Sequence, residues 1–140
     1  DVTIQAQILK LMRELNERLN TAIMLITHDL GVVAETCERV VVMYAGQVVE
    51  EAPVTEIFKN PQHPYTQGLI QSVPDMRYKK DSLYSIPGNV PKPGSIKQGC
   101  RFAPRCEFAT KRCIQETPPL YETSSTHKSR CFLVEEGAKA

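Results

Sequence analysis

The first part of the chain combines a helical pattern with a short run that is apolar on every side. Residues 2–19 place apolar side chains at three- and four-residue spacing, which predicts a helix with one apolar face. Residues 21–27 are apolar without alternation, as is typical of a strand buried in a parallel sheet. His28 follows the predicted strand directly, and Asp29 is placed to cap a short helix over residues 30–37. This order of elements predicts an α/β fold.

A hairpin is the next predicted element. Residues 39–44 form an apolar strand, Ala45 and Gly46 form a turn, and residues 47–50 form the returning strand. We expect Tyr44 to pack at the end of the first strand.

Prolines divide the rest of the chain. Helices are predicted over residues 54–59 and 65–72, each opened by a proline, with the second expected to end at Pro74. The residues His63, Pro64 and Tyr65 are expected to shape the turn before the second helix.

Beyond Pro74, further prolines and glycines interrupt every candidate element up to Cys100. We therefore expect a boundary near residues 75–82, with one domain over residues 1–75 and an irregular Cys-rich extension over residues 76–140. The extension has few apolar residues, and a segment of its size usually needs a covalent or metal staple.

Composition narrows the class of protein. The chain has 140 residues, 41% of them hydrophobic, and its 17 Lys and Arg face 16 Asp and Glu. This near balance excludes a basic surface of the kind that binds nucleic acid. The longest apolar run, residues 22–26, is too short to span a bilayer, so membrane association is expected to go through partners. The chain opens with neither a secretory signal nor Met, so we read it as a fragment or a processed chain.

Five cysteines suggest two different roles. Cys37 stands alone at the end of a predicted helix and is expected to be a plain, partly buried thiol. The other four follow the pattern C-x5-C-x6-C-x17-C at Cys100, Cys106, Cys113 and Cys131. Nothing indicates export, so this group favours metal or iron–sulfur binding over disulfides.

The nature of the bound group stays open among three alternatives. Structural zinc sites usually use C-x2-C pairs, which are absent here, whereas a cuboidal iron–sulfur cluster tolerates wider loops. Free thiols, or disulfides formed during handling, are the third alternative. His127 could replace a cysteine ligand, although a solvent-exposed loop histidine is the expected reading. Nearby positive charges would offset a thiolate-bound cluster; they are Arg101, Arg105, Lys111 and Arg112.

His28 is the main candidate for chemistry in the first domain. Ligands of open α/β sheets gather beyond the carboxyl ends of the strands, where an imidazole can donate an N–H to a phosphate oxygen. A single histidine after a strand is nevertheless more often structural, so the role of His28 must be judged from the residues around it.

Those neighbours resemble a known family. The segments DVTIQAQIL, LITHDLGVVA and VMYAGQVVE, at residues 1–9, 25–34 and 42–50, resemble the end of the nucleotide-binding domain of an ABC transporter. More narrowly, NPQHPYTQGL and GCRFAPRC, at residues 60–69 and 99–106, are similar to the ATP-binding subunits of oligopeptide and dipeptide importers. The resemblance implies the C-terminal part of a P-loop-type domain, with a parallel core strand, helices and a small antiparallel hairpin.

The resemblance also implies roles and partners. Asp1 would be the Asp of the D-loop at the dimer interface, and His28 the switch histidine that contacts the γ-phosphate of ATP and positions the attacking water. The partners would be a second ATPase subunit, membrane permease subunits and, indirectly, an external peptide-binding protein, at the cytoplasmic face of the plasma (inner) membrane. Some members of the subfamily hold a [4Fe–4S] cluster on four such cysteines.

Several family motifs are missing from these 140 residues. A phosphate-binding Gly-rich loop, the Leu-Ser-Gly-Gly-Gln signature and the strand that ends in Asp-Glu and holds Mg²⁺ are all absent. The chain alone is therefore expected neither to bind ATP well nor to hydrolyse it. The leading interpretation is part of an ATPase subunit for import of oligopeptides or dipeptides. The alternatives are a metal or iron–sulfur module for regulation or assembly, and an isolated dimerisation fragment.

Overall fold

The computed structural model describes residues 2–74 and 84–137 of the chain. These residues form two compact units that divide between Glu38 and Arg39, here called unit 1 and unit 2. Asp1 and the expected boundary at residues 75–82 lie outside the described residues, so both stay predictions. Each unit is described by itself.

Unit 1 contains the two predicted helices. Helix α1 spans Val2–Leu19 and has no buried residue, while α2 spans Leu30–Thr36 and buries Val33. The Asp29 carboxylate caps α2, because its Oδ1 accepts the backbone N–H of Gly31 at 2.9 Å and that of Val32 at 3.2 Å. Both helices and the cap confirm the sequence pattern. Cys37 is a half-buried thiol at the end of α2, as expected.

The strand expected at residues 21–27 is wrong. This segment has no regular secondary structure, and its apolar side chains are open to solvent; Met24 is 88% exposed and Ile26 91%. A buried parallel strand needs hydrogen-bonded neighbours on both edges, and no described strand pairs with this segment.

Unit 2 is built on the predicted hairpin. Strand β1 spans Arg39–Tyr44 and pairs in antiparallel fashion with β2, which spans Gln47–Pro53 and is three residues longer than expected. Ala45 and Gly46 turn the chain with positive φ angles of 48° and 77°, the left-handed pair that a two-residue hairpin requires. A β-bulge between Val42 and Met43 shifts the register.

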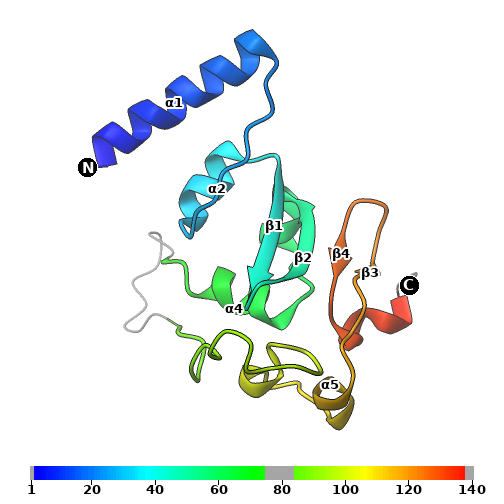
Figure 1. The fold of residues 1–140 in the computed structure, drawn as a ribbon. Coiled ribbons are helices and arrows are strands. Elements are labelled where there is room, and N and C mark those ends of the chain that lie inside the picture. The colour runs from blue at the N-terminus through cyan, green and yellow to red at the C-terminus, as the bar shows by residue number, and fades with distance from the viewer. Residues whose placement is uncertain (1, 75–83, 138–140) are drawn as a thin grey trace. The chain divides into compact units, whose positions relative to one another are not determined.

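Two further strands join this hairpin from the end of the chain. Strand β4, Lys128–Ser129, pairs with β2, and β3, Tyr121–Glu122, pairs with β4, giving the order β1-β2-β4-β3. All the pairs are antiparallel. Figure 1 shows the orange β3 and β4 beside the cyan and green hairpin. The described structure is therefore a mixture of helices and a small antiparallel sheet.

Short helices complete unit 2. Helices α3, Val54–Lys59, and α4, Pro64–Gln71, confirm the two that the sequence predicts. The late segment adds η1 at Ala103–Arg105, α5 at Lys111–Gln115 and η2 at Phe132–Gly137. Within the described ranges, no helix combines the length and apolar character that crossing a membrane would need.

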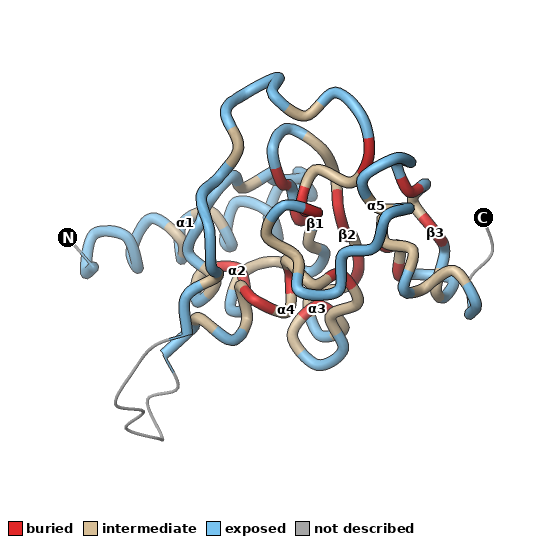
Figure 2. The backbone as a smooth tube through the Cα atoms, turned by 90° about the horizontal axis from the view of Figure 1, so that it is seen from below, coloured by how far each residue is buried: buried red, intermediate tan, exposed pale blue. Residues whose placement is uncertain are grey.

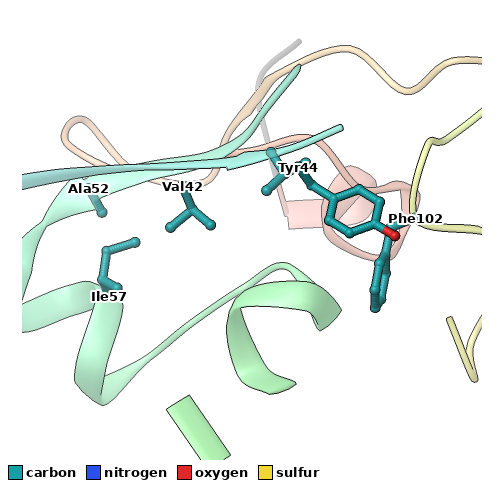
Figure 3. Close-up of a cluster of buried hydrophobic side chains, with 6 residues drawn as sticks. Val42, Tyr44, Ala52, Ile57 and Phe102 are labelled. Atoms are coloured by element: carbon teal, nitrogen blue, oxygen red, sulfur yellow. The ribbon is translucent and has the colours of Figure 1, made fainter. Parts of the chain in front are cut away.

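The core of unit 2 draws on distant parts of the chain. Ile57 of α3 faces Val42 and Ala52 of the hairpin, and Phe102 of the late segment lies beside Tyr44 (Figure 3). Tyr44 is 4% exposed, which confirms its expected packing at the end of β1. Buried stretches lie on β1, β2 and the helices that follow them, and also on the late segment near β3 (Figure 2). The late segment thus folds onto the hairpin and shares its core.

Candidate metal centre

The four late cysteines surround one cavity. Cys100, Cys106, Cys113 and Cys131 all line a pocket with a volume of about 220 Å³. All four are half-buried free thiols, and they come from four different segments around η1, α5 and the end of β4. The other walls include the rings of Phe102, Phe108 and Phe132. Four soft sulfur donors therefore face one apolar space.

Burial and neighbouring cysteines shift the pKa values of three of the thiols. Burial raises the pKa of Cys100 and Cys106, and it raises the pKa of Cys131 to about 11. Each of these pKa values is also raised by other cysteines of the group, and together these effects link every pair of the four. Cys100, Cys106 and Cys131 are therefore neutral at pH 7 unless a cation binds and displaces their protons.

Gly99 allows the loop that carries Cys100 to approach α5. Its φ is +81°, and a Cβ there would lie 2.4 Å from the backbone oxygen of Ile114. The close approach lets the N–H of Cys100 donate to the carbonyl of Cys113 at 2.7 Å. Thr110 caps α5 and accepts the N–H of Cys113. Backbone geometry therefore fixes Cys100 against Cys113.

Arg130 fixes Cys131 against the hairpin. Its backbone N–H donates to the carbonyl of Val49 at 2.8 Å, and its Nε–H donates to the carbonyl of Val48 at the same distance. A third donor, Nη1, reaches the carbonyl of Pro118 at 3.2 Å. Because Val48 and Val49 lie beside the β-bulge, the bulged part of β2 holds the residue before Cys131.

Phe102 and Arg105 hold the segment that carries Cys106. The Phe102 ring lies 5.2 Å from that of Tyr44, 5.5 Å from that of Tyr65 and 5.8 Å from that of His63. Arg105 donates to the carbonyls of residues 86 and 87, at 3.1 and 2.9 Å. The motif around residues 63–65 thus packs directly on the motif around Cys106.

His127 is buried, so the expectation of a solvent-exposed loop histidine is wrong. It is 3% exposed, with Nε2 2.5 Å from Glu50 Oε1 and Nδ1 3.1 Å from Glu56 Oε2. Glu50 is fully buried and also accepts the backbone N–H groups of Gln62 and His63, at 2.6 and 2.9 Å. His127 does not line the cysteine cavity. It ties the β3–β4 segment to β2 and α3.

Glu50 is a buried structural residue that the sequence pattern does not single out. The sequence indicates only that Glu50 belongs to the returning strand, because its hydrogen-bond partners lie 12 to 77 residues away. The one available signal is a Glu that directly follows two valines in the returning strand.

His63 has a buried position between α4 and the cavity. It is 1% exposed, and its Nδ1 accepts the N–H of Tyr65 at 3.0 Å, which caps α4. This confirms that the residues around Pro64 shape a turn and open a helix. Burial lowers the pKa of His63 to about 4, an effect that the backbone of Arg130 partly offsets. The ring is therefore neutral at pH 7, and it lines the cysteine cavity.

His28 lies exposed at a bend between the extended residues 21–27 and α2. Since the expected core strand is absent among the described residues, this geometry leaves the phosphate contact of His28 a prediction. The D-loop role of Asp1 also stays a prediction.

A site for a single metal ion needs closely spaced ligands. Zinc–sulfur bonds of about 2.3 Å would hold four tetrahedral ligands within roughly 4 Å of one another. Among the described side chains, no group of three or more His, Cys, Asp or Glu is arranged to hold a metal ion. The four cysteines share a cavity, but they are not arranged as ligands around an ion in the described structure.

Comparison with known proteins finds similar sequences among the ATP-binding proteins of peptide transporters. Residues 49–113 match the family described as the oligopeptide/dipeptide transporter, C-terminal region. The chain is 53% identical over 136 residues to the oligopeptide transport ATP-binding protein AppD of Bacillus subtilis. It is 53% identical over 137 residues to a probable peptide ABC transporter ATP-binding protein of Sinorhizobium fredii, and 49% identical over 142 residues to a putative peptide import ATP-binding protein of Brucella ovis. Each alignment covers 97% of this chain but only 41–42% of the relative.

Proposed function

We propose that this chain forms part of the subunit that powers a peptide importer. The premise is its family: the chain belongs to the oligopeptide/dipeptide ABC transporter ATP-binding family and carries its C-terminal region. The observation that carries the proposal is the 53% identity to an oligopeptide transport ATP-binding protein over 97% of the chain. ATP and Mg²⁺ would be bound by the whole subunit, because the sequence here lacks the phosphate loop and the Mg²⁺-binding strand.

Within such a subunit, Asp1 and His28 would serve the nucleotide site. His28 would donate to the γ-phosphate and orient the attacking water, while Asp1 would act across the interface between two ATPase subunits. The subunits would dock on membrane permease subunits at the cytoplasmic face of the membrane, and an external binding protein would deliver the peptide. Several polar side chains of α1 and its apolar stripe are exposed and available for such contacts.

A chimera tests the transport proposal. These residues would replace the matching segment of the Bacillus subtilis AppD protein, and uptake of a labelled oligopeptide would be measured in cells. We expect uptake to continue in the chimera and to be lost when His28→Ala is added, at equal protein level. Uptake that survives His28→Ala would contradict the assigned role of His28. Failure of the chimera with a folded, membrane-associated subunit would contradict the assignment to peptide import.

We further propose that Cys100, Cys106, Cys113 and Cys131 hold a [4Fe–4S] cluster with a structural role. The four thiols line one cavity whose other walls are mostly apolar, and thiolates are the ligands that an iron–sulfur cluster takes. When bound, such a cluster supplies four iron–sulfur bonds that join the four segments. Structural zinc is the alternative that a metal analysis would reveal.

Only one of the four basic residues expected to offset the charge of the cluster lies at the cavity. Arg112 lines the cavity, where its guanidinium lies 3.9 Å from the centre of the Phe132 ring. It is also paired with Glu116 at 3.2 Å and with Glu135 at 2.5 Å, so much of its charge is already balanced. Burial, which opposes charge, and neighbouring N–H groups, which stabilise it, are therefore the main local influences on the charge of the cluster.

A further inference from the structure

Three buried polar side-chain atoms lack a hydrogen-bond partner among the described residues. They are Nε2 of His63, Oγ1 of Thr66 and Oγ of Ser129. A buried polar atom without a partner is costly and calls for a specific explanation. Of these three residues, only His63 lines the cavity that the four cysteines share.

The hydrogen bond at the other ring nitrogen fixes which form of His63 is present. Nδ1 accepts the N–H of Tyr65 at 3.0 Å, so it carries a lone pair and the ring proton resides on Nε2. His63 therefore presents a single N–H donor that α4 does not use. The backbone of Arg130 acts on the ring but does not meet Nε2 in hydrogen-bond geometry.

The position of the ring is set by its neighbours on every side. Its backbone N–H donates to the buried Glu50, its side chain caps α4, and its ring packs on Phe102 at 5.8 Å. These contacts hold the imidazole as a rigid part of the cavity wall. An N–H held in this way needs no reorganisation to meet an acceptor in the cavity.

We propose that His63 is a positioning residue whose Nε2–H donates a hydrogen bond to a sulfur of the group held by Cys100, Cys106, Cys113 and Cys131. This inference rests on the proposed cluster. Sulfur is the acceptor chemistry that the cavity offers, since its other walls are mostly aromatic and aliphatic. A hydrogen bond to sulfur stabilises the more negative, reduced state, so His63 raises the reduction potential of the site.

Two substitutions separate this role from the capping role. His63→Asn keeps an oxygen that can accept the Tyr65 N–H, but its amide stops short of the Nε2 position. His63→Phe keeps the ring and removes both nitrogens. Thr66→Val is the matched control, because it removes a buried hydroxyl without a partner from the same helix but does not line the cavity.

The experiment is an anaerobic redox titration of the full chain reconstituted with iron and sulfide. We expect both His63 variants to lower the midpoint potential so that the ratio of reduced to oxidised protein at a fixed potential changes about tenfold, or ~59 mV for one electron. Thr66→Val should match the unsubstituted chain. An unchanged potential in His63→Asn, with full iron content, would overturn the inference and leave the proposed cluster intact. A chain that retains no iron would overturn both.

A measurement on the unsubstituted chain covers the case in which neither His63 variant folds. Pulsed electron paramagnetic resonance of the reduced protein, labelled with ¹⁵N in its histidine rings, should detect one coupled nitrogen and one exchangeable proton. The chain has three histidines, and the other two do not line the cavity. Absence of both couplings in a protein with a reduced cluster would overturn the inference.

Discussion

Units 1 and 2 differ sharply in how far their apolar side chains are buried. Eight of the nine buried apolar side chains found among the described residues lie in unit 2, and Val33 is the exception. In unit 1, the stripe along α1 is exposed, from Val2 at 83% to Leu15 at 43%. An amphipathic helix with an uncovered stripe is a surface that needs a partner. Unit 2 has its own core, because distant segments meet over the hairpin.

The largest expected effect is the loss of the buried carboxylate in unit 2. Glu50→Ala leaves Nε2 of His127 and two backbone N–H groups without their partner, and should lower the free energy of unfolding by about 3–5 kcal/mol. All five tyrosines lie after residue 43, so tyrosine fluorescence during urea unfolding reports on unit 2.

Glu51→Ala is the matched control for Glu50→Ala. Glu51 is the next residue of β2, and its pairs with Arg39 and Lys128 lie at the surface. Its removal should cost less than about 1 kcal/mol. Equal losses for the two variants would show that the buried network does not hold unit 2 together.

Acid should weaken unit 2 through His63. Its pKa is about 4 in the folded chain and 6.5 otherwise, so the unfolded chain binds the proton first as the pH falls. This contribution to stability is complete above pH 6.5 and declines toward pH 4, by roughly 3 kcal/mol in total. Urea unfolding of metal-free protein at several pH values should show a steeper decline than in His63→Asn. Identical pH profiles would contradict the burial of a neutral ring.

Substitutions at two glycines distinguish the cost of backbone strain from the cost of a steric clash in the cysteine region. Gly94 and Gly99 have similar positive φ angles, 74° and 81°, but only Gly99 has backbone atoms where a Cβ would lie. Gly94→Ala should cost about 1 kcal/mol, and Gly99→Ala at least about 2–3 kcal/mol with a loss of metal retention. Thermal unfolding and metal analysis would measure both. Similar losses in stability would argue against the close approach of Cys100 to Cys113.

The smallest effect is expected in unit 1. Leu11 is 55% exposed on α1, so Leu11→Ala should change the stability of the chain by less than about 0.5 kcal/mol. Helical circular dichroism would measure the change. A loss of several kcal/mol would mean that the stripe of α1 is already covered in the isolated chain, and the contrast between the units would fail.

Local signals in the sequence predicted most of the elements. The spacing of apolar residues located α1, the Asp29 cap located α2, and Ala45 with Gly46 located the hairpin turn. Proline positions located α3 and α4. The prediction of a strand at residues 21–27 is wrong for a physical reason. A continuous apolar run indicates that a segment would be buried in a sheet, but a strand forms only where another strand can pair with it.

Long-range contacts were beyond the sequence. Strands β3 and β4 have two residues each, too few for a pattern, and they exist because β2 offers them an edge. His127 looked like a loop residue because its partners Glu50 and Glu56 lie 77 and 71 positions away. The spacing of the cysteines suggested a shared site, but only the fold brings them to one cavity.

The central claim is that the late segment is held together by a cluster on four cysteines. The most direct test is iron, acid-labile sulfide and zinc analysis of the full chain prepared without oxygen, with Cys113→Ser as the comparison. We expect a brown protein that absorbs near 400 nm, with about four irons and four sulfides per chain, both lost in Cys113→Ser. A colourless, folded protein with one zinc, or with no metal after reconstitution, would contradict the claim.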